Sequence, residues 1–240
     1  MSRTFKIGTL VMVVALGLAF AAGTLEAQPD PGSDPDLDPC IAVDNGSGTV
    51  SLPPQGCSYM TADDVHQAID SLDPTTTIIL APIHTNFICK RLGHCDTPGG
   101  TLGGDQENFT STGLFTAVGT GKLAGFSRTI AVPLAVETHT GKRTPKDPVQ
   151  AFETDMYRIE GEISGDPDFA SLRIVGGTAN GFPSPGKTIL TQQSNGDFLV
   201  DSEFNVGFEI YIEGAEGGRL EGFKGSYKGT SKMQAIKKCQ

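Results

Sequence analysis

Apolar and polar residues alternate along most of the second half of the chain. A period of two is typical of β-strands that bury one face. The pattern predicts strands over Leu114–Val118, Phe126–Val136, Ala151–Ile163, Leu172–Val175, Thr188–Gln192, Phe198–Phe204, Val206–Ile212 and Gly222–Met233.

Turn-forming residues separate these expected strands. Asn195-Gly196, between Gln192 and Phe198, predicts a hairpin because both turn residues tolerate a positive φ. The chain has 31 Gly and 15 Pro, which suits many short strands joined by tight turns. We therefore predict a mainly β fold whose core spans residues 111–240, a single antiparallel β-barrel or, alternatively, a β-sandwich.

The region before residue 111 carries different patterns. In residues 61–72, apolar residues recur at i, i+3, i+4 and i+7 from Val65, which predicts one short helix. The apolar run Thr76–Pro82 predicts a buried strand, and the Gly-rich residues 90–108 predict a loop. Residues 40–110 are expected to pack on the barrel as a helix, a strand and disulfide-bearing loops.

Residues 1–27 have the layout of a secretory signal peptide. Two basic residues precede an apolar run from Ile7 to Ala22, which is too short to span a membrane comfortably, and small residues follow. Residues 28–39 are rich in Pro and Asp and predict a disordered linker. We therefore expect an exported protein, periplasmic or extracellular, with no membrane segment once the signal is removed.

The charge and the motifs narrow the function further. The formal net charge is −10 at pH 7, and such a surface disfavours nucleic acid and anionic lipid as partners. A small ligand or an extracellular partner remains open. The sequence has no Gly-x-Ser-x-Gly elbow, P-loop, dinucleotide fingerprint or His-Glu-x-x-His motif, which argues against the enzyme classes that those motifs identify.

The chain has five cysteines: Cys40, Cys57, Cys89, Cys95 and Cys239. In an exported protein the simplest disulfides are Cys40–Cys57 and Cys89–Cys95, with Cys239 left over. The spacing does not fix the connectivity, and Cys239 could instead pair with Cys40. A zinc site that combines Cys89 and Cys95 with His84 and His94 is the alternative, but the spacing matches no common zinc pattern.

The densest group of polar residues lies in and around an expected hairpin across residues 140–150. Glu137 and His139 share one face of a strand, and Asp155 lies on the strand that follows. These three residues are candidates for ligands of Ca²⁺ or Zn²⁺, or for acid/base catalysis. Charged residues nearby are candidates for ligand binding: Arg143, Asp147, Glu153 and Arg158. The alternative is a solvated hairpin face on which arginines pair with acids.

Three other polar motifs have simpler interpretations. His84 follows an apolar run, and we expect a hydrogen-bonded histidine at a strand end. Asp105-Gln106-Glu107 lies in a Gly-rich stretch and is expected to be solvated. Asp166-Pro167-Asp168 is expected to form a β-turn, with calcium binding as the alternative.

The pattern Gly-x-Leu-x-Gly-Phe occurs twice, at residues 121–126 and 218–223. In each copy a glycine makes the turn, a buried leucine follows, and a second glycine allows close strand crossing before a buried phenylalanine. This corner resembles the turn of dirigent and allene-oxide-cyclase-like eight-stranded barrels. The resemblance implies a closed barrel and assigns no catalytic residue.

A second resemblance rests on a longer block: Glu137-Thr138-His139-Thr140-Gly141-Lys142-Arg143-Thr144-Pro145, Asp147-Pro148-Val149-Gln150 and Thr154-Asp155-Met156. The block is similar to an uncharacterised family of exported bacterial proteins, and the similarity runs from about Met60 to Gly229. It implies export and no particular activity.

These observations favour a non-enzymatic exported β-domain that acts as a binding or surface/structural module. The alternative is a barrel-type enzyme, either a small-molecule cyclase or lyase or a cation-assisted hydrolase, whose polar cluster faces a pocket. Carbohydrate binding is a second alternative, which the lack of Trp disfavours. For the non-enzymatic module, the residues expected to fill the interior are Leu114, Leu123, Phe126, Ile130, Phe152, Ile159, Phe208 and Ile210.

Overall fold

The structure, a computed structural model, describes residues 38–61, 65–68, 75–89 and 95–237. The chain separates into two units, Met1–Pro35 and Asp36–Gln240, and every described residue belongs to the second. The expected signal peptide, most of the expected linker, His94 and Cys239 lie outside the described residues.

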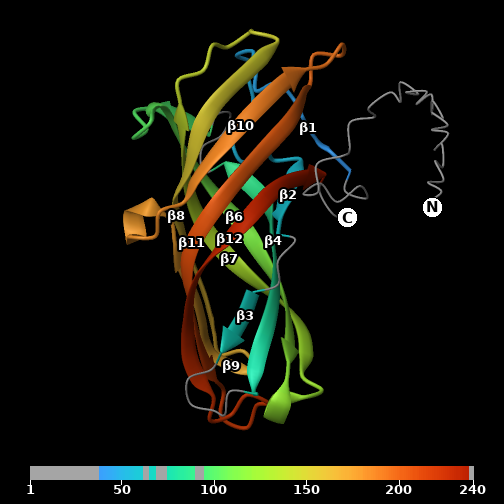
Figure 1. Ribbon diagram of the computed structural model, residues 1–240, viewed down its shortest axis with the longest axis vertical. Coiled ribbons are helices and arrows are strands. Elements are labelled where there is room, and N and C mark those ends of the chain that lie inside the picture. Colours follow the sequence, from blue (N-terminus) through green and yellow to red (C-terminus); the bar gives the residue numbers. More distant parts are fainter. Residues whose placement is uncertain (1–37, 62–64, 69–74, 90–94, 238–240) are drawn as a thin grey trace, which may run out of the picture. The chain divides into compact units, whose positions relative to one another are not determined.

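The described chain is mainly β, and its strands form one large antiparallel sheet (Figure 1). The strands in chain order are β1 (Cys40–Ala42), β2 (Cys57–Met60), β3 (Val65–Ala68), β4 (Thr77–Cys89), β5 (Asp96–Pro98), β6 (Gly103–Gly119), β7 (Ser127–Gly141), β8 (Val149–Ser164), β9 (Phe169–Gly176), β10 (Pro185–Gln192), β11 (Phe198–Gly214) and β12 (Lys224–Lys237). Two short 3₁₀ helices, η1 (Gly121–Leu123) and η2 (Thr178–Asn180), complete it.

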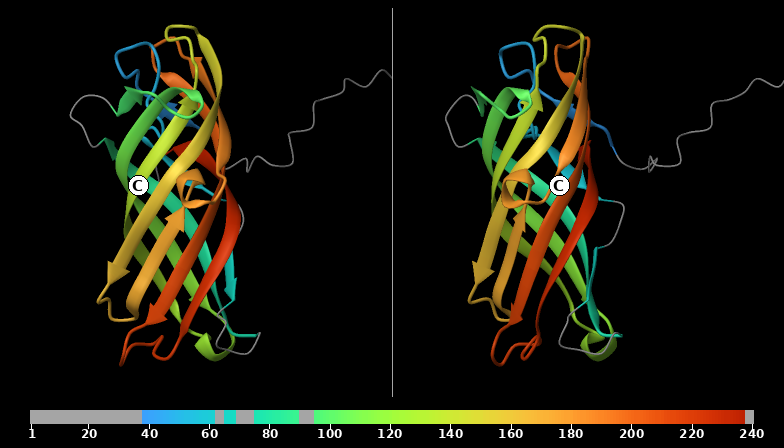
Figure 2. Two further views of the ribbon diagram at one scale, coloured as in Figure 1. Left: turned by 90° about the vertical axis from the view of Figure 1, so that its left-hand side faces the viewer. Right: turned by 60° about the vertical axis from the view of Figure 1, so that its left-hand side comes forward.

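Eight strands close the sheet into a ring that is not a regular barrel (Figure 2). Their order is β4-β2-β12-β11-β10-β8-β7-β6, and β6 pairs back onto β4. The closure is irregular at β2, which pairs with β4 only at Tyr59↔His84 and Met60↔Ile83. Because one sheet closes on itself, the β-sandwich alternative does not describe the fold.

Two strands share one position in this ring. Both β9 and β10 pair with β8 and β11, at different ends of these long strands. Between them the chain leaves the sheet as η2, which projects from the side of the ring in Figures 1 and 2. Gly177 N donates to Gly207 O at 3.1 Å before this excursion, and Met156 N donates to Ser184 O at 3.0 Å after it.

The alternating pattern located the strands of the second half correctly. Each expected strand falls on an observed one, although Phe198–Phe204 and Val206–Ile212 are parts of a single strand, β11. The Asn195-Gly196 hairpin is confirmed, since Gln192 pairs with Phe198 and Gly196 has a φ of 92°. Both local disulfides are present, Cys40–Cys57 and Cys89–Cys95.

The helix expected over residues 61–72 is wrong where the structure describes it. Val65–Ala68 form β3, which pairs antiparallel with β4 over Thr77–Leu80. The pairing of β2 with β4 ends at Ile83, so β3 provides partners for the next backbone groups along that edge. Tertiary pairing therefore overrides the local period. Among the described residues, no helix is long and apolar enough to cross a membrane.

The loop expected over residues 90–108 is wrong for most of the part that the structure describes. Residues 96–98 form β5, and β6 begins at Gly103. A Cβ at Gly104 would lie 2.3 Å from Gly141 O, so this glycine permits close strand approach rather than a loop. The expected boundary after residue 110 falls inside β6, and β2 and β4 are members of the ring.

The interior of the ring holds the main apolar cluster. Tyr59, Phe87, Phe109 and Phe204 form an aromatic layer in which neighbouring rings meet edge to face at 5.5–6.4 Å. Seven of the eight expected interior residues are buried. Leu114 is only half-buried, because Gly113 and Phe115 on either side of it are the buried residues of the strand.

A second apolar cluster lies beneath the N-terminal segment. Phe152, which was expected in the main interior, packs here instead with Val50, Leu52 and Phe198. The Cys40–Cys57 disulfide belongs to the same cluster. The cluster therefore holds the segment between β1 and β2 against the strands of the ring.

The two Gly-x-Leu-x-Gly-Phe corners lie at the same end of the ring (Figure 1) and share the same closing turn, although their first glycines differ in conformation. Phe126 N donates to Leu123 O at 2.9 Å, and Phe223 N donates to Leu220 O at 3.0 Å. Both leucines are buried. The fifth residue of each corner is a glycine with positive φ, 93° at Gly125 and 78° in the second copy. The repeated pattern is thus a repeated structure.

Asp168 ties these corners together. It lies in the tight connection between β8 and β9, where a turn was expected, and accepts hydrogen bonds from Arg128 at 2.9 Å and from Arg219 at 2.6 and 3.0 Å. Asp166 pairs with Arg128 as well. Both carboxylates that calcium would need as ligands are therefore paired with arginines.

Candidate functional site

The candidate cluster around His139 lies on the outer side of β7, where Glu137 and His139 point away from the interior. His139 Nε2 lies 3.0 Å from Glu137 Oε1, and Nδ1 lies 2.8 Å from Thr101 Oγ1. Tyr157 stacks on the imidazole with ring centroids 4.0 Å apart. Glu137 and His139 are buried under these neighbours, so the solvated-face alternative is wrong for both.

Asp155 lies opposite His139 but makes a different contact. Its Oδ1 accepts a hydrogen bond from Thr178 of η2 at 2.7 Å. Burial raises the pKa of Asp155, and the Thr178 hydrogen bond and His139 oppose the shift. In the described part of the chain, no three His, Cys, Asp or Glu side chains are placed to hold a metal ion. The geometry therefore gives the Ca²⁺ or Zn²⁺ interpretation no support.

Thr101, His139 and Glu137 form a chain of contacts from a hydroxyl through an imidazole to a carboxylate. The same order of groups occurs where a base activates a nucleophile and an acid orients the base. The backbone N–H of Thr101 also donates to His139 Nδ1, at 3.2 Å. The imidazole thus accepts hydrogen bonds that hold the glycine-rich turn before β6 against β7. We assign His139 a positioning role for this turn.

The other binding candidates do not come together. Asp147 and Glu153 are exposed, and Arg158, whose side chain is 47% exposed, lies 3.9 Å from Glu137. Arg143 is different, because its side chain is only 3% exposed. It belongs to a separate group just beyond the end of β7, the strand that begins directly after the first glycine corner.

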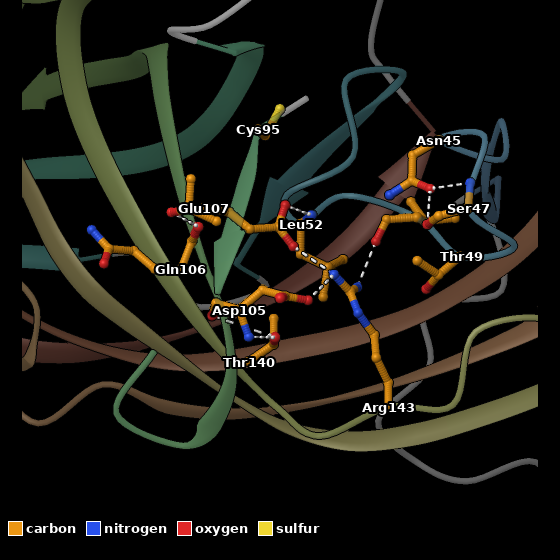
Figure 3. Close-up of polar contacts among 12 residues, drawn as sticks. Asn45, Ser47, Thr49, Leu52, Cys95, Asp105, Gln106, Glu107, Thr140 and Arg143 are labelled. Atoms are coloured by element: carbon orange, nitrogen blue, oxygen red, sulfur yellow. Dashed lines mark hydrogen bonds and ion pairs between the residues drawn. The ribbon is translucent and has the colours of Figure 1, made fainter. Parts of the chain in front are cut away.

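Arg143 is the centre of a buried polar clamp, defined here as Arg143, Asp105, Glu107 and the backbone of Val50 and Leu52 (Figure 3). Arg143 donates to Val50 O at 2.7 Å, to Asp105 at 3.1 Å and to Glu107 at 3.0 Å. Leu52 N donates to the other oxygen of Glu107 at 2.6 Å. The clamp fixes the segment between β1 and β2 to β6 and β7.

Glu107 was expected to be solvated, and that expectation is wrong. Its side chain is fully buried. Burial raises the pKa of Glu107 to about 8, although Arg143 and the Leu52 N–H pull it down. Only the ionised form of this carboxyl, which dominates above that pH, needs Arg143 for the compensation of its charge.

The interior of the ring contains a cavity of about 60 Å³. The polar residues of its lining are His84 and Ser231, and the remaining lining is apolar apart from the backbone of Gly113. Seven strands contribute to it: β4, β6, β7, β8, β9, β11 and β12. Glu137, His139 and Asp155 are not among the lining residues.

His84 is the titratable residue of this cavity. Its Nε2 lies 2.7 Å from Ser111 Oγ, and its ring meets Phe87 edge to face at 4.6 Å. Burial lowers the pKa of His84 to about 3. The imidazole is therefore neutral at pH 7. The hydrogen bond was expected, but His84 lies inside β4 rather than at a strand end.

His84→Gln should make the protein more resistant to acid. A folded-state pKa below the unfolded value of about 6.5 means that the unfolded chain binds the proton first. The stability is complete above that value and falls as the pH drops towards 3, by about 1.4 kcal/mol per pKa unit. Urea unfolding at pH 7, 5 and 4 should show a smaller loss in the variant, and equal losses would contradict the expectation.

Several residues of these sites were not predicted from the sequence. At a period of two, Glu107, Phe109, Ser111, Gly113 and Phe115 fall on one face of a strand, and all five are buried. This alternation is visible in the sequence, but the glycines at residues 99–104 suggested a loop for the residues up to 108. The partners Thr101, Tyr157 and Thr178 carry no comparable sequence signal, because they reach the cluster through a turn, a bulge and an excursion.

Comparisons of the chain with family models, with curated protein sequences and with solved structures gave no match. The function therefore has to be inferred from the geometry of the chain itself.

Proposed function

We propose that the protein is an exported, non-enzymatic binding module that holds a compact apolar group of a small ligand inside its ring. The observation that carries the proposal is the apolar cavity to which seven strands contribute. The secretory layout of residues 1–27 and the two disulfides support export. The two glycine corners support the finer description of the ring as a barrel of the dirigent or allene-oxide-cyclase type.

Unfilled apolar space is informative because protein interiors are packed like organic crystals. Side chains around a void lose contacts there, and an apolar void stays dry and takes up small apolar molecules. One water molecule occupies about 30 Å³ of the liquid, so 60 Å³ admits only a few non-hydrogen atoms. The fit is therefore to an apolar group of about three carbon atoms, such as an isopropyl group, rather than to a ring or a whole acyl chain.

The enzyme alternative has less support. An enzyme needs its acid and base beside the pocket that binds the substrate. Here the acidic and histidine candidates lie on the outer side of β7 and β8, in contact with a turn and with η2. The cavity lining has no carboxylate.

Propane is a suitable probe for the proposed site. Saturating propane should raise the melting temperature, because a ligand that binds only the native state stabilises it by RT ln(1 + [L]/Kd), about 2.7 kcal/mol at one hundred times Kd. Methyl NMR signals of the lining residues Leu134 and Ile174 should shift with the same Kd.

Val206→Phe and Val149→Phe form a matched pair for this experiment. Val206 lines the cavity, whereas Val149 is 57% exposed on β8. Val206→Phe should weaken propane binding at least tenfold by filling the space, and Val149→Phe should leave it unchanged. The melting temperature without ligand shows whether each variant folds. Absence of binding to the native protein, or equal weakening by both variants, would contradict the proposal.

A further inference from the structure

We propose that the ligand carries one uncharged hydrogen-bonding group, a hydroxyl or a carbonyl, beside its apolar group, and that His84 together with Ser111 binds it. This inference rests on the proposed function and names the chemical class of the ligand. It assigns a specificity role to a histidine that belongs to neither the clamp nor the His139 cluster.

The first step is the position of the pair. His84 lines the cavity from β4, and Ser111 lies on the neighbouring strand β6. Their hydrogen bond of 2.7 Å occupies His84 Nε2. Among the contacts of the described residues, Nδ1 has no hydrogen-bond partner, so it is the ring nitrogen that a ligand can use. An imidazole in an otherwise apolar lining can orient a ligand through a hydrogen bond, whereas the apolar side chains contribute only van der Waals contacts.

The second step is the adaptability of the pair. In a neutral imidazole one nitrogen donates and the other accepts, and a serine hydroxyl can do either. If Ser111 donates to Nε2, then Nδ1 carries the proton and can donate to a carbonyl. If Ser111 accepts from Nε2, then Nδ1 accepts from a hydroxyl. The pair can therefore satisfy either ligand group without the appearance of a charge.

The third step is the exclusion of charged ligands. The lining has no Lys, Arg, Asp or Glu, and burial keeps His84 neutral at pH 7. A carboxylate or an ammonium group would lose its hydration there without an opposite charge, which costs far more than one hydrogen bond returns. Ser231, on β12, adds only a second neutral hydroxyl.

Small ligands of similar size test the inference. Propane, 2-propanol, acetone and acetate are titrated at pH 7, with the methyl signals of Leu134 and Ile174 as the readout. In the native protein the alcohol or the ketone should bind at least as tightly as the hydrocarbon, although water solvates it better. The carboxylate should not bind.

The variants His84→Phe and Ser111→Ala remove the pair from either side. A buried hydroxyl without a partner costs about 1–3 kcal/mol, so the affinity for the alcohol relative to the hydrocarbon should fall at least fivefold in each. Ser202→Ala is the matched control, since Ser202 is a buried serine that bonds Tyr59 and Thr188 outside the cavity lining. It should leave the ratio unchanged. If His84→Phe does not fold, Ser111→Ala decides the test.

The outcomes separate the two proposals. Propane binding together with an unchanged ratio in both variants would overturn the inference and leave the proposed function standing. Binding of the carboxylate would overturn the inference as well. If none of the four compounds binds, the proposed function fails, and the inference fails with it.

Discussion

Arg143→Met is expected to lower the free energy of unfolding by about 3–5 kcal/mol. The variant keeps most of the volume of the side chain but leaves the fully buried Glu107 without its positive partner. It also removes the hydrogen bond to Val50 O, whose distance is 2.7 Å. Breaking a buried network of hydrogen bonds and ion pairs is among the few single changes with an effect of this size.

The measurement is urea unfolding of the native protein, of Arg143→Met and of the double variant Arg143→Met/Glu107→Met. Replacing both members of a buried ion pair by apolar residues of similar volume is often neutral or stabilising, so the double variant should recover most of the loss. Arg158→Met is the matched control, because that arginine is 47% exposed and should matter by less than about 0.5 kcal/mol.

The pH dependence gives this prediction a second readout. The folded pKa of Glu107, raised to about 8, lies above its ordinary value of 4.5. Its protonation therefore favours folding at low pH, and this contribution is lost as the pH rises from 4.5 through 8. Without Arg143 the folded pKa rises further, so the two proteins should lose stability in parallel between pH 5 and pH 7. The deficit of Arg143→Met should grow above pH 8, where Glu107 ionises in the native protein only. A deficit that does not grow above pH 8, or one below about 1 kcal/mol, would contradict the role assigned to the clamp.

The strands and the hairpin could be predicted because their information is local. Alternation fixes which residues share a face, and Asn-Gly fixes a turn, within a few positions of the sequence. The clamp depends on distant pairs instead: Leu52 meets Glu107 across 55 positions, and Arg143 meets Val50 across 93. No local pattern specifies such contacts. The helix prediction failed for the same reason, since β3 forms by pairing with β4.

The candidate site shows the same division. The sequence correctly grouped Glu137 with His139, because residues two apart on a strand share a face. It missed that Asp155 bonds η2, since the excursion between β9 and β10 leaves no periodic signal. The cavity is harder still to foresee, because it depends on how the side chains of seven strands fill one interior.

Asp168→Ala is expected to destabilise the protein by about 2–3 kcal/mol. Asp168 bonds both arginines at the end of the ring that carries the two glycine corners. Arg219 also lies over the Phe126 ring at 4.6 Å, so it joins the second corner to the first. Removal of Asp168 releases Arg219 and leaves Arg128 with Asp166 alone.

The same unfolding measurement at several pH values tests the cause of this effect. The hydrogen bond from Arg219, followed by that from Arg128, holds the pKa of Asp168 below its usual value of 3.8. A lowered folded pKa stabilises the protein above 3.8, and the contribution is lost as the pH falls below it. The gap between the native protein and Asp168→Ala should therefore be widest at neutral pH and should shrink below pH 4. Asp201→Ala, at an exposed position of β11, should show no gap. A gap that stays constant down to pH 2 would mean that packing, not the ion pairs, holds the corners together.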